Sequence, residues 1–299
     1  MALAMLRRAK PLLGTIVEIR ANCDHEASFV AATDAAFARI ANIHRAMSFH
    51  EPQSDLQAVA RCRAGEHVVV DQDTWNVLQL ALQIERDSES IFNPTIAPML
   101  VRNGLLPHPS GVGDAPNPST LASSIRLDES WVVQVLQPVW IDLGGIAKGY
   151  AVDAATVALI EHGVHSGVVN AGGDLRVFGD AEQQINLRHP VRPDTFIPVA
   201  RLRDMSCATS GDYFVARASD GTAQSAIIGD RTAHANTSVI VFASSCAVAD
   251  ALTKVLWLAG LDSPRGQAIL DQYDAQAAVA DNRGVYKASP HAAALAHAH

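Results

Sequence analysis

Hydrophobic and polar positions along the chain follow two periods, one typical of strands and the other of helices. Residues 15–20 read Thr-Ile-Val-Glu-Ile-Arg, a run rich in β-branched side chains that predicts a strand. Over residues 26–47, apolar side chains such as Phe29, Ile40 and Met47 recur at helical spacing. This segment is therefore expected to be a helix that packs one apolar stripe against the core.

Further elements follow at shorter range. A helix is expected over Thr74–Arg86, with Asp73 as its N-terminal cap. The other predicted helices span residues 147–162, 246–259 and 264–272, and the other predicted strands span residues 131–137, 167–170, 174–178, 196–202, 238–242 and 277–280. Because strands and helices are interspersed without a regular βαβ repeat, the pattern favours the α+β class over a doubly wound sheet.

Two segments lack the large apolar side chains of a core element. Residues 107–124 are rich in Pro, Gly, Ser and Asn, which predicts an excursion over the surface. Residues 287–299 end in an Ala/His stretch and are expected to form a disordered tail.

Composition excludes several classes of protein. With 48% hydrophobic residues and 23 Lys and Arg against 31 Asp and Glu, the net charge of −8 predicts a globular protein without the electrostatic footprint of a nucleic-acid or anionic-membrane binder. No apolar run approaches the roughly 20 residues that cross a bilayer. The four cysteines are too far apart for metal-cluster pairs: Cys23, Cys62, Cys207 and Cys246. They predict buried free thiols and, because the N-terminus does not read as a secretory signal, a cytoplasmic protein.

The densest candidate site is Ile141–Tyr150, which reads Ile-Asp-Leu-Gly-Gly-Ile-Ala-Lys-Gly-Tyr and predicts a strand that runs through two glycines into a helix. Glycines at such a junction let a ligand approach the backbone, and the helix N-terminus offers N–H groups to a phosphate. The run is not a Walker A loop, because Gly149 follows Lys148 where Ser or Thr would reach a metal. A tight turn without a ligand explains these residues equally well.

Two more polar clusters follow predicted strands. The pair Gly172-Gly173 is one, and the run Ala-Thr-Ser-Gly-Asp-Tyr-Phe over residues 208–214 is the other. Two glycine turns after strands suggest the rim of one cleft. A nucleophile elbow needs Gly-x-Ser-x-Gly, which the sequence lacks, so a serine hydrolase is not expected.

Asp250 lies one turn inside an otherwise apolar helix that opens with hydroxyl caps. A buried carboxylate needs a partner, and a metal or another cation would serve. The local alternative is a helical ion pair with Lys254, which follows four residues later with the acid first.

Several of these runs together resemble one known family. Leu13-Gly14-Thr15, the run Phe-Asn-Pro-Thr at 92–95, and residues 141–153, 169–179, 208–214 and 238–260 occur in the order and spacing of the ApbE family, the FAD:protein FMN transferases. The resemblance extends from about residue 12 to residue 286, as one domain of two lobes. Its most specific motif is Asp-Leu-Gly-Gly-Ile-Ala-Lys-Gly-Tyr-Ala-Val-Asp at residues 142–153.

The resemblance implies a two-lobed α+β fold of mixed, largely antiparallel sheets flanked by helices, with FAD in a cleft between the lobes and Mg²⁺ near the pyrophosphate. Family enzymes split FAD, join its FMN half through phosphate to a threonine of a partner flavoprotein, and release AMP. By matching position, the metal ligands would be the Ala147 carbonyl, Asp250 and a helix threonine. The residues that would line or shape the FAD site are Gly144, Gly145, Ala147, Lys148, Asp153, Gly172, Gly173, Asp174, Thr209, Ser210, Gly211, Asp212, Ile227 and Lys254.

Two departures from the family pattern concern its chemistry. Ala226 stands where the family has a histidine that is thought to act in flavinyl transfer, and His234 is the nearest replacement. Lys254 stands where the family commonly has the metal-binding threonine. Because a helix turns by about 100° per residue, either Thr253 or Lys254 could face Asp250. Thr253 would preserve a metal site in altered form, whereas Lys254 would repel Mg²⁺ and replace it as the cation beside the pyrophosphate.

Three hypotheses follow from the sequence. The first is an active FAD:protein FMN transferase with a relocated base. The second is a FAD-binding or carrier protein of the same fold without transferase chemistry, which the loss of both side chains favours. The third is an interaction module that no longer binds FAD. Family membership favours the transferase class.

Overall fold

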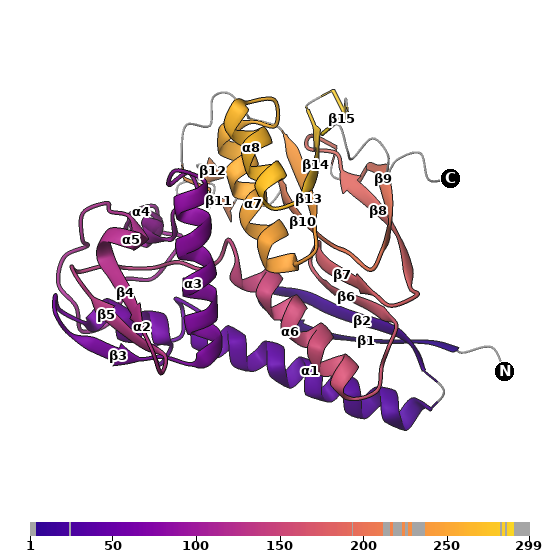
Figure 1. Cartoon of the computed structure of the whole chain (residues 1–299), viewed down its shortest axis with the longest axis horizontal. Coiled ribbons are helices and arrows are strands. Elements are labelled where there is room, and N and C mark those ends of the chain that lie inside the picture. The colour runs from indigo at the N-terminus through magenta and orange to yellow at the C-terminus, as the bar shows by residue number, and fades with distance from the viewer. Residues whose placement is uncertain are drawn as a thin grey trace. The chain divides into compact units, whose positions relative to one another are not determined.

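Figure 1 shows the computed structural model of the chain, which describes residues 4–23, 25–192, 194–211, 216–217, 223–224, 227–228, 237–281, 283–284 and 286–289. Predictions that concern Asp212, Ala226, His234 and the stretch from residue 290 onward lie outside these residues. The chain divides into two compact units. Unit 1 comprises Met1–Asn42, Lys148–Tyr213 and Arg231–His299, and unit 2 comprises Ile43–Ala147 and Phe214–Asp230.

Unit 1 is built on an eight-stranded sheet with the order β1-β2-β6-β7-β10-β13-β14-β15. Its strands are β1 (Ala4–Leu12), β2 (Thr15–Cys23), β6 (Gly167–Ala171), β7 (Asp174–Phe178), β10 (Ser206–Gly211), β13 (Ser238–Ala243), β14 (Gln276–Ala280) and β15 (Tyr286–Ala288). Each pair of neighbouring strands is antiparallel. The α+β class with largely antiparallel sheets is therefore confirmed.

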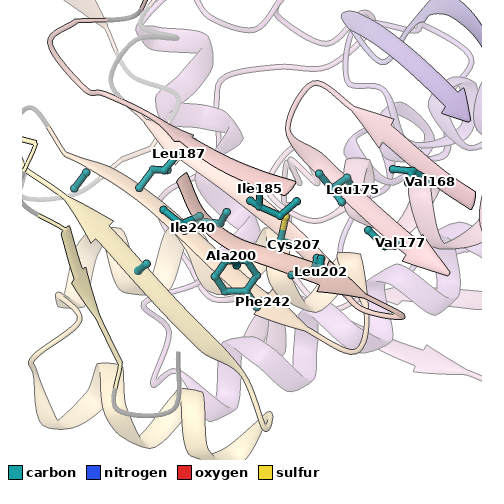
Figure 2. Close-up of a cluster of buried hydrophobic side chains, with 13 residues drawn as sticks. Val168, Leu175, Val177, Ile185, Leu187, Ala200, Leu202, Cys207, Ile240 and Phe242 are labelled. Carbon is teal, nitrogen blue, oxygen red and sulfur yellow. The ribbon is translucent and has the colours of Figure 1, made fainter. Parts of the chain in front are cut away.

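Both faces of this sheet are covered at its centre. All six residues of β13 are buried, although successive side chains of a strand point to opposite faces. On one face, Ile240 and Phe242 pack with side chains of the hairpin formed by β8 (Glu182–Arg188) and β9 (Phe196–Arg203), as Figure 2 shows. Helix α7 (Cys246–Ala259) packs against β10 and β13. The core of unit 1 thus lies on both sides of one sheet.

The helices of unit 1 match the hydrophobic pattern closely. Helix α1 (Glu26–Met47), whose last turn belongs to unit 2, and helices α7 and α8 (Pro264–Gln272) begin and end at the predicted residues. Helix α6 (Ala147–Glu161) is one residue shorter than predicted. The first turns of α7 and α8 are capped by the hydroxyls of Ser245 and Ser263, and Gly260 ends α7 with a positive φ of 84°.

Unit 2 combines short helices with a three-stranded sheet of order β3-β5-β4. Its elements are α2 (Asp55–Arg61), β3 (His67–Val69), α3 (Gln72–Asp87), the 3₁₀ turn η1 (Pro94–Ile96), α4 (Ala97–Arg102), α5 (Leu121–Ser124), β4 (Ile125–Asp128), β5 (Val132–Val135), β11 (Ala216–Arg217) and β12 (Ala223–Gln224). The predicted cap of α3 was wrong by two residues. Asp71 is the cap, and its carboxylate accepts a hydrogen bond from the Asp73 backbone N–H at 2.8 Å.

Two further predictions in unit 2 were wrong. Residues 141–143 form no strand; Ile141 and Leu143 are fully buried, so the apolar run reflects packing and not a ladder. The excursion at 107–124 ends in a core element, because Leu121 opens α5 and is fully buried. The buried carboxylate of Glu85 accepts hydrogen bonds from the Leu121 and Ala122 backbone N–H groups at 2.6 and 2.9 Å. A partner 36 residues away thus stabilises a helix that composition does not predict.

The cysteines are free thiols, as predicted, but only two of them are buried. Cys207 and Cys246 lie in the core of unit 1, where burial raises the pKa of each thiol. Cys23 and Cys62 are half-exposed because they lie at the end of β2 and just after α2. In the part of the chain that the structure describes, no helix has the length and apolar character needed to span a membrane.

Candidate functional site

Four charged side chains of unit 1 meet in one cluster. Lys148 comes from the first turn of α6, Asp174 from the start of β7, and Asp250 and Lys254 from successive turns of α7. Lys148 Nζ forms an ion pair with Asp174 Oδ2 and lies 3.6 Å from Asp250 Oδ2. Lys254 Nζ forms an ion pair with Asp250 Oδ1. We call these four residues the charge cluster.

Burial divides the charge cluster into an inner and an outer part. The side chains of Asp250 and Asp174 are 0% and 2% exposed, whereas those of Lys254 and Lys148 are 18% and 35% exposed. The two carboxylates are therefore buried, and the two lysine side chains are partly exposed. Two acids and two bases leave the cluster without net charge, which removes most of the penalty for burying isolated carboxylates.

The pKa values follow from this arrangement. Burial alone would lower the pKa of Lys148, but Asp174 and Asp250 outweigh it and hold that pKa above its usual value. Burial and the charge of Asp250 raise the pKa of Asp174. Asp250 differs because Lys148 and Lys254 overcome the effect of burial and lower its pKa. Asp250 is thus the carboxylate most firmly held in its charged form.

Glycines bring the three elements of the charge cluster close together. A Cβ on Gly149 would lie 2.2 Å from the Cys246 carbonyl oxygen, so only glycine lets α6 approach the start of α7 this closely. The Gly149 N–H donates to Asp250 Oδ2 at 3.3 Å. Gly172 and Gly173 form the turn between β6 and β7 with φ of 68° and 109°, which places Asp174 at the head of its strand. The contribution of Gly149 was not predicted, although a glycine inside a helical pattern is a signal of close packing.

Both side chains that compete for the position next to Asp250 have partners in the structure. Thr253 is fully buried, and its hydroxyl donates to the Asp250 backbone carbonyl at 2.7 Å and lies 2.8 Å from Ser210 Oγ. Lys254 turns to the carboxylate of Asp250 and also donates to its carbonyl at 3.1 Å. Of the two alternatives, the geometry favours Lys254 as the cation beside Asp250.

The residues present do not fit the Mg²⁺ that the family resemblance implies. Both carboxylate oxygens of Asp250 already contact N–H or ammonium groups, and the Thr253 hydroxyl is used within the protein. A divalent ion requires several oxygen ligands and is repelled by two neighbouring ammonium groups. Among the described residues, no group of three or more His, Cys, Asp and Glu side chains could hold a metal ion.

Other predicted residues of unit 1 surround the charge cluster. Thr209 Oγ1 donates to the Gly173 carbonyl at 3.1 Å, which ties β10 to the glycine turn. Ser210 contacts Thr253, and Gly211 ends β10 opposite Ser238. Residues 208–211 of the predicted polar cluster thus belong to strand β10. Thr209 of this strand contacts the glycine turn, and Ser210 contacts helix α7.

Asp153, which the family resemblance assigns to the residues that line or shape the FAD site, is engaged at the start of α7. Its carboxylate accepts hydrogen bonds from Ser245 Oγ and from the backbone N–H groups of Cys246 and Ala247, each at 2.9 Å. Both oxygens are therefore engaged at the N-terminus of α7. Asp153 thus fixes the helix that carries Asp250 and Lys254, and its predicted place in the FAD site stays a prediction.

The remaining predicted site residues belong to unit 2. Gly144 and Gly145 lie in the turn before α6, where the Gly144 N–H donates to Asp142 Oδ1 at 3.2 Å. Ala147 is the first residue of α6, and Ile227 is half-buried. Their predicted contacts with FAD, and the Ala147 carbonyl as a metal ligand, stay predictions.

The fold defined by these elements matches solved structures over almost the whole chain. The crystal structure of an ApbE protein from Thermotoga maritima matches 98% of this chain and 100% of its own with a TM-score of 0.81 and 23% identity. The flavin transferase ApbE from Vibrio cholerae matches 98% of this chain and 99% of its own with a TM-score of 0.78 and 20% identity. These similarities establish the fold.

The family follows from the sequence match. Residues 13–280 match the model of the ApbE family, and the chain belongs to this family. A FAD:protein FMN transferase from Treponema pallidum is 26% identical in an alignment that covers 85% of this chain and 79% of the relative. The resemblance stated from the motifs is confirmed, and the chain is a homologue of FAD:protein FMN transferases.

Proposed function

We propose that this protein binds FAD through its pyrophosphate at the charge cluster and catalyses transfer of the FMN half to a hydroxyl group of a partner protein. One observation carries the proposal. Three family motifs that are far apart in the sequence, at residues 141–153, 169–179 and 238–260, each contribute a charged side chain to the charge cluster. Convergence of charged side chains from three separate motifs is expected of a ligand site.

The reaction that fits this site is a phosphoryl transfer. The oxygen of the acceptor threonine forms a bond to the phosphorus of the FMN half, and the bond from that phosphorus to the bridging oxygen breaks. AMP leaves with the bridging oxygen, and the hydroxyl proton passes to a base. The ammonium groups of Lys148 and Lys254 would stabilise the charge that develops on the pyrophosphate oxygens.

The base that accepts the proton of the acceptor hydroxyl is not assigned in this mechanism. Ala226 occupies the position of the family histidine, and an alanine cannot accept a proton. His234 is the candidate for a relocated base. This substitution, together with the ion pair between Lys254 and Asp250, favours a second function: a protein that binds FAD without cleaving it.

Chromatography of the nucleotides after incubation with FAD, in which water stands in for the acceptor hydroxyl and AMP and FMN report the cleavage, distinguishes the two functions. We expect AMP to appear with the wild type and to be lost in Asp250→Asn, because Lys254 then loses its carboxylate partner and Lys148 keeps only Asp174. FAD that stays bound to the protein without release of AMP would establish the second function. The variant Ala226→His then shows whether the missing base is the defect, since restoring it should raise the yield of AMP. Failure to bind FAD at all would contradict both functions.

A further inference from the structure

We infer that the charge cluster binds the FAD pyrophosphate without a metal ion, with the ammonium of Lys254 in the role that a divalent cation has in related sites. This inference rests on the proposed binding of FAD. It goes beyond that proposal because it specifies which positive charge meets the phosphates.

Both carboxylate oxygens of Asp250 already have partners within the protein. One carboxylate oxygen contacts Lys254 Nζ, and the other accepts from the Gly149 N–H at 3.3 Å and lies 3.6 Å from Lys148 Nζ. To bind a metal, this carboxylate would have to release an ammonium group. The metal would then lie between two lysines, where its charge is repelled from both sides.

The lysine side chains of the charge cluster are more exposed to solvent than its carboxylates. The carboxylates of Asp174 and Asp250 are buried, whereas Lys148 and Lys254 lie above them and are partly exposed. A ligand that approaches from solvent therefore meets the lysine side chains before the carboxylates, which hold the two ammonium groups. This order of charges suits an anion; a cation site would present the carboxylates instead.

The Thr253 hydroxyl is also engaged within the protein. It donates to the Asp250 carbonyl and contacts Ser210 Oγ, so it is directed into the protein at a fully buried position. A threonine next to Asp250 is thus present in the chain but takes no part in the charge cluster. Replacing Lys254 by threonine would place a free hydroxyl beside Asp250 and remove one ammonium group.

The test is a titration of the apoprotein with FAD, followed by flavin fluorescence in excess EDTA and in MgCl₂. For the wild type we expect the same affinity in both buffers. Lys254→Thr should bind FAD about tenfold more weakly in EDTA, because one of two ammonium contacts is lost, and should recover in MgCl₂. Lys254→Met should be weakened in both buffers, since methionine offers no oxygen ligand. Lys287→Thr, which removes an exposed lysine of unit 1 that pairs with Asp262, is the matched control and should behave as the wild type.

Binding of Mn²⁺ to the apoprotein, measured by electron paramagnetic resonance, supplies a readout that needs no FAD. We expect the wild type to leave Mn²⁺ free. Mn²⁺ bound by the wild type and released by Asp250→Asn would overturn the inference, as would FAD binding that requires Mg²⁺; the proposed function would survive both results. A wild type that binds no FAD in either buffer would refute the proposed function and the inference with it. Circular dichroism establishes that each variant is folded.

Discussion

Four buried or half-buried acidic side chains of this protein differ in the groups that they bind. Asp153 in unit 1 and Glu85 in unit 2 each accept hydrogen bonds from the backbone at the start of a helix. Asp174 and Asp250 instead hold lysines that reach the solvent. The first kind satisfies the fold internally, because its partners are fixed N–H groups. The second kind keeps charges available at the surface, which is what a binding site for an anion requires.

The largest effect is expected from Asp250→Ala. This variant leaves Lys148 and Lys254 without the carboxylate between them and should lower the free energy of unfolding by about 3–5 kcal/mol. FAD affinity should fall as well, because Lys254 loses the carboxylate that fixes its position and Lys148 is held by Asp174 alone. Urea denaturation and FAD titration measure the two effects. Asp262→Ala, which removes an exposed acid 3.6 Å from Lys287, is the control and should change stability by no more than about 1 kcal/mol. Unchanged FAD affinity in Asp250→Ala would place the site elsewhere.

The charge cluster should also give the stability a characteristic dependence on pH. The pKa of Lys148 is raised in the folded protein, so its contribution to stability is fully present below the unfolded value of 10.5 and is lost as the pH rises through the folded pKa. Comparison of the wild type with Lys148→Met by urea denaturation should therefore give a constant difference from about pH 7 to 9 and a smaller one near pH 11. A difference that grows toward alkaline pH would contradict the assigned ion pairs.

Asp153→Ala should separate stability from binding. The variant removes three hydrogen bonds from the start of α7, and the free energy of unfolding should fall by about 2 kcal/mol, as for the loss of a strong helix cap. Since Asp153 acts only by positioning α7, we expect FAD affinity of the folded variant to fall less than in Asp250→Ala. Asp153→Asn should restore part of the stability, because its amide keeps one acceptor oxygen. Equal losses of affinity in Asp153→Ala and Asp250→Ala would show that Asp153 contacts the ligand.

Much of the fold could be predicted where one apolar period extends over several turns. Helices α1, α7 and α8 have the predicted bounds because each carries an apolar face, and Ser245 and Gly260 mark the two ends of α7 and Ser263 the start of α8. Strand β1 was missed because Arg7, Arg8 and Lys10 interrupt its pattern, and β8 was missed because it reads Glu-Gln-Gln-Ile-Asn-Leu-Arg. These strands are stabilised by pairing and packing against distant residues, such as Asp34 with Arg8, which local propensity does not contain.

In the candidate site, too, the sequence predicted the residues but not the contacts between residues that are distant along the chain. The motifs identified Lys148, Asp174 and Asp250, but not how they meet. Whether Thr253 or Lys254 turns toward the Asp250 carboxylate depends on the packing of Thr253 against Ser210, which is 43 residues away. Asp153 was assigned to the ligand because its partners lie 92–94 residues further along the chain. Helical geometry alone allowed either arrangement, and tertiary contacts decided between them.

The smallest effect, and the sharpest contrast with the charge cluster, is expected from Glu85→Gln. Its carboxylate holds the Leu121 and Ala122 N–H groups at the start of α5, and a glutamine keeps one acceptor oxygen while placing an amide donor against the other N–H group. We expect a loss of about 1–2 kcal/mol in the free energy of unfolding, measured by urea denaturation. FAD affinity should not change, because Glu85 holds backbone and not a lysine. If Glu85→Gln lost FAD affinity without losing stability, the interpretation that Glu85 only stabilises the fold would be wrong.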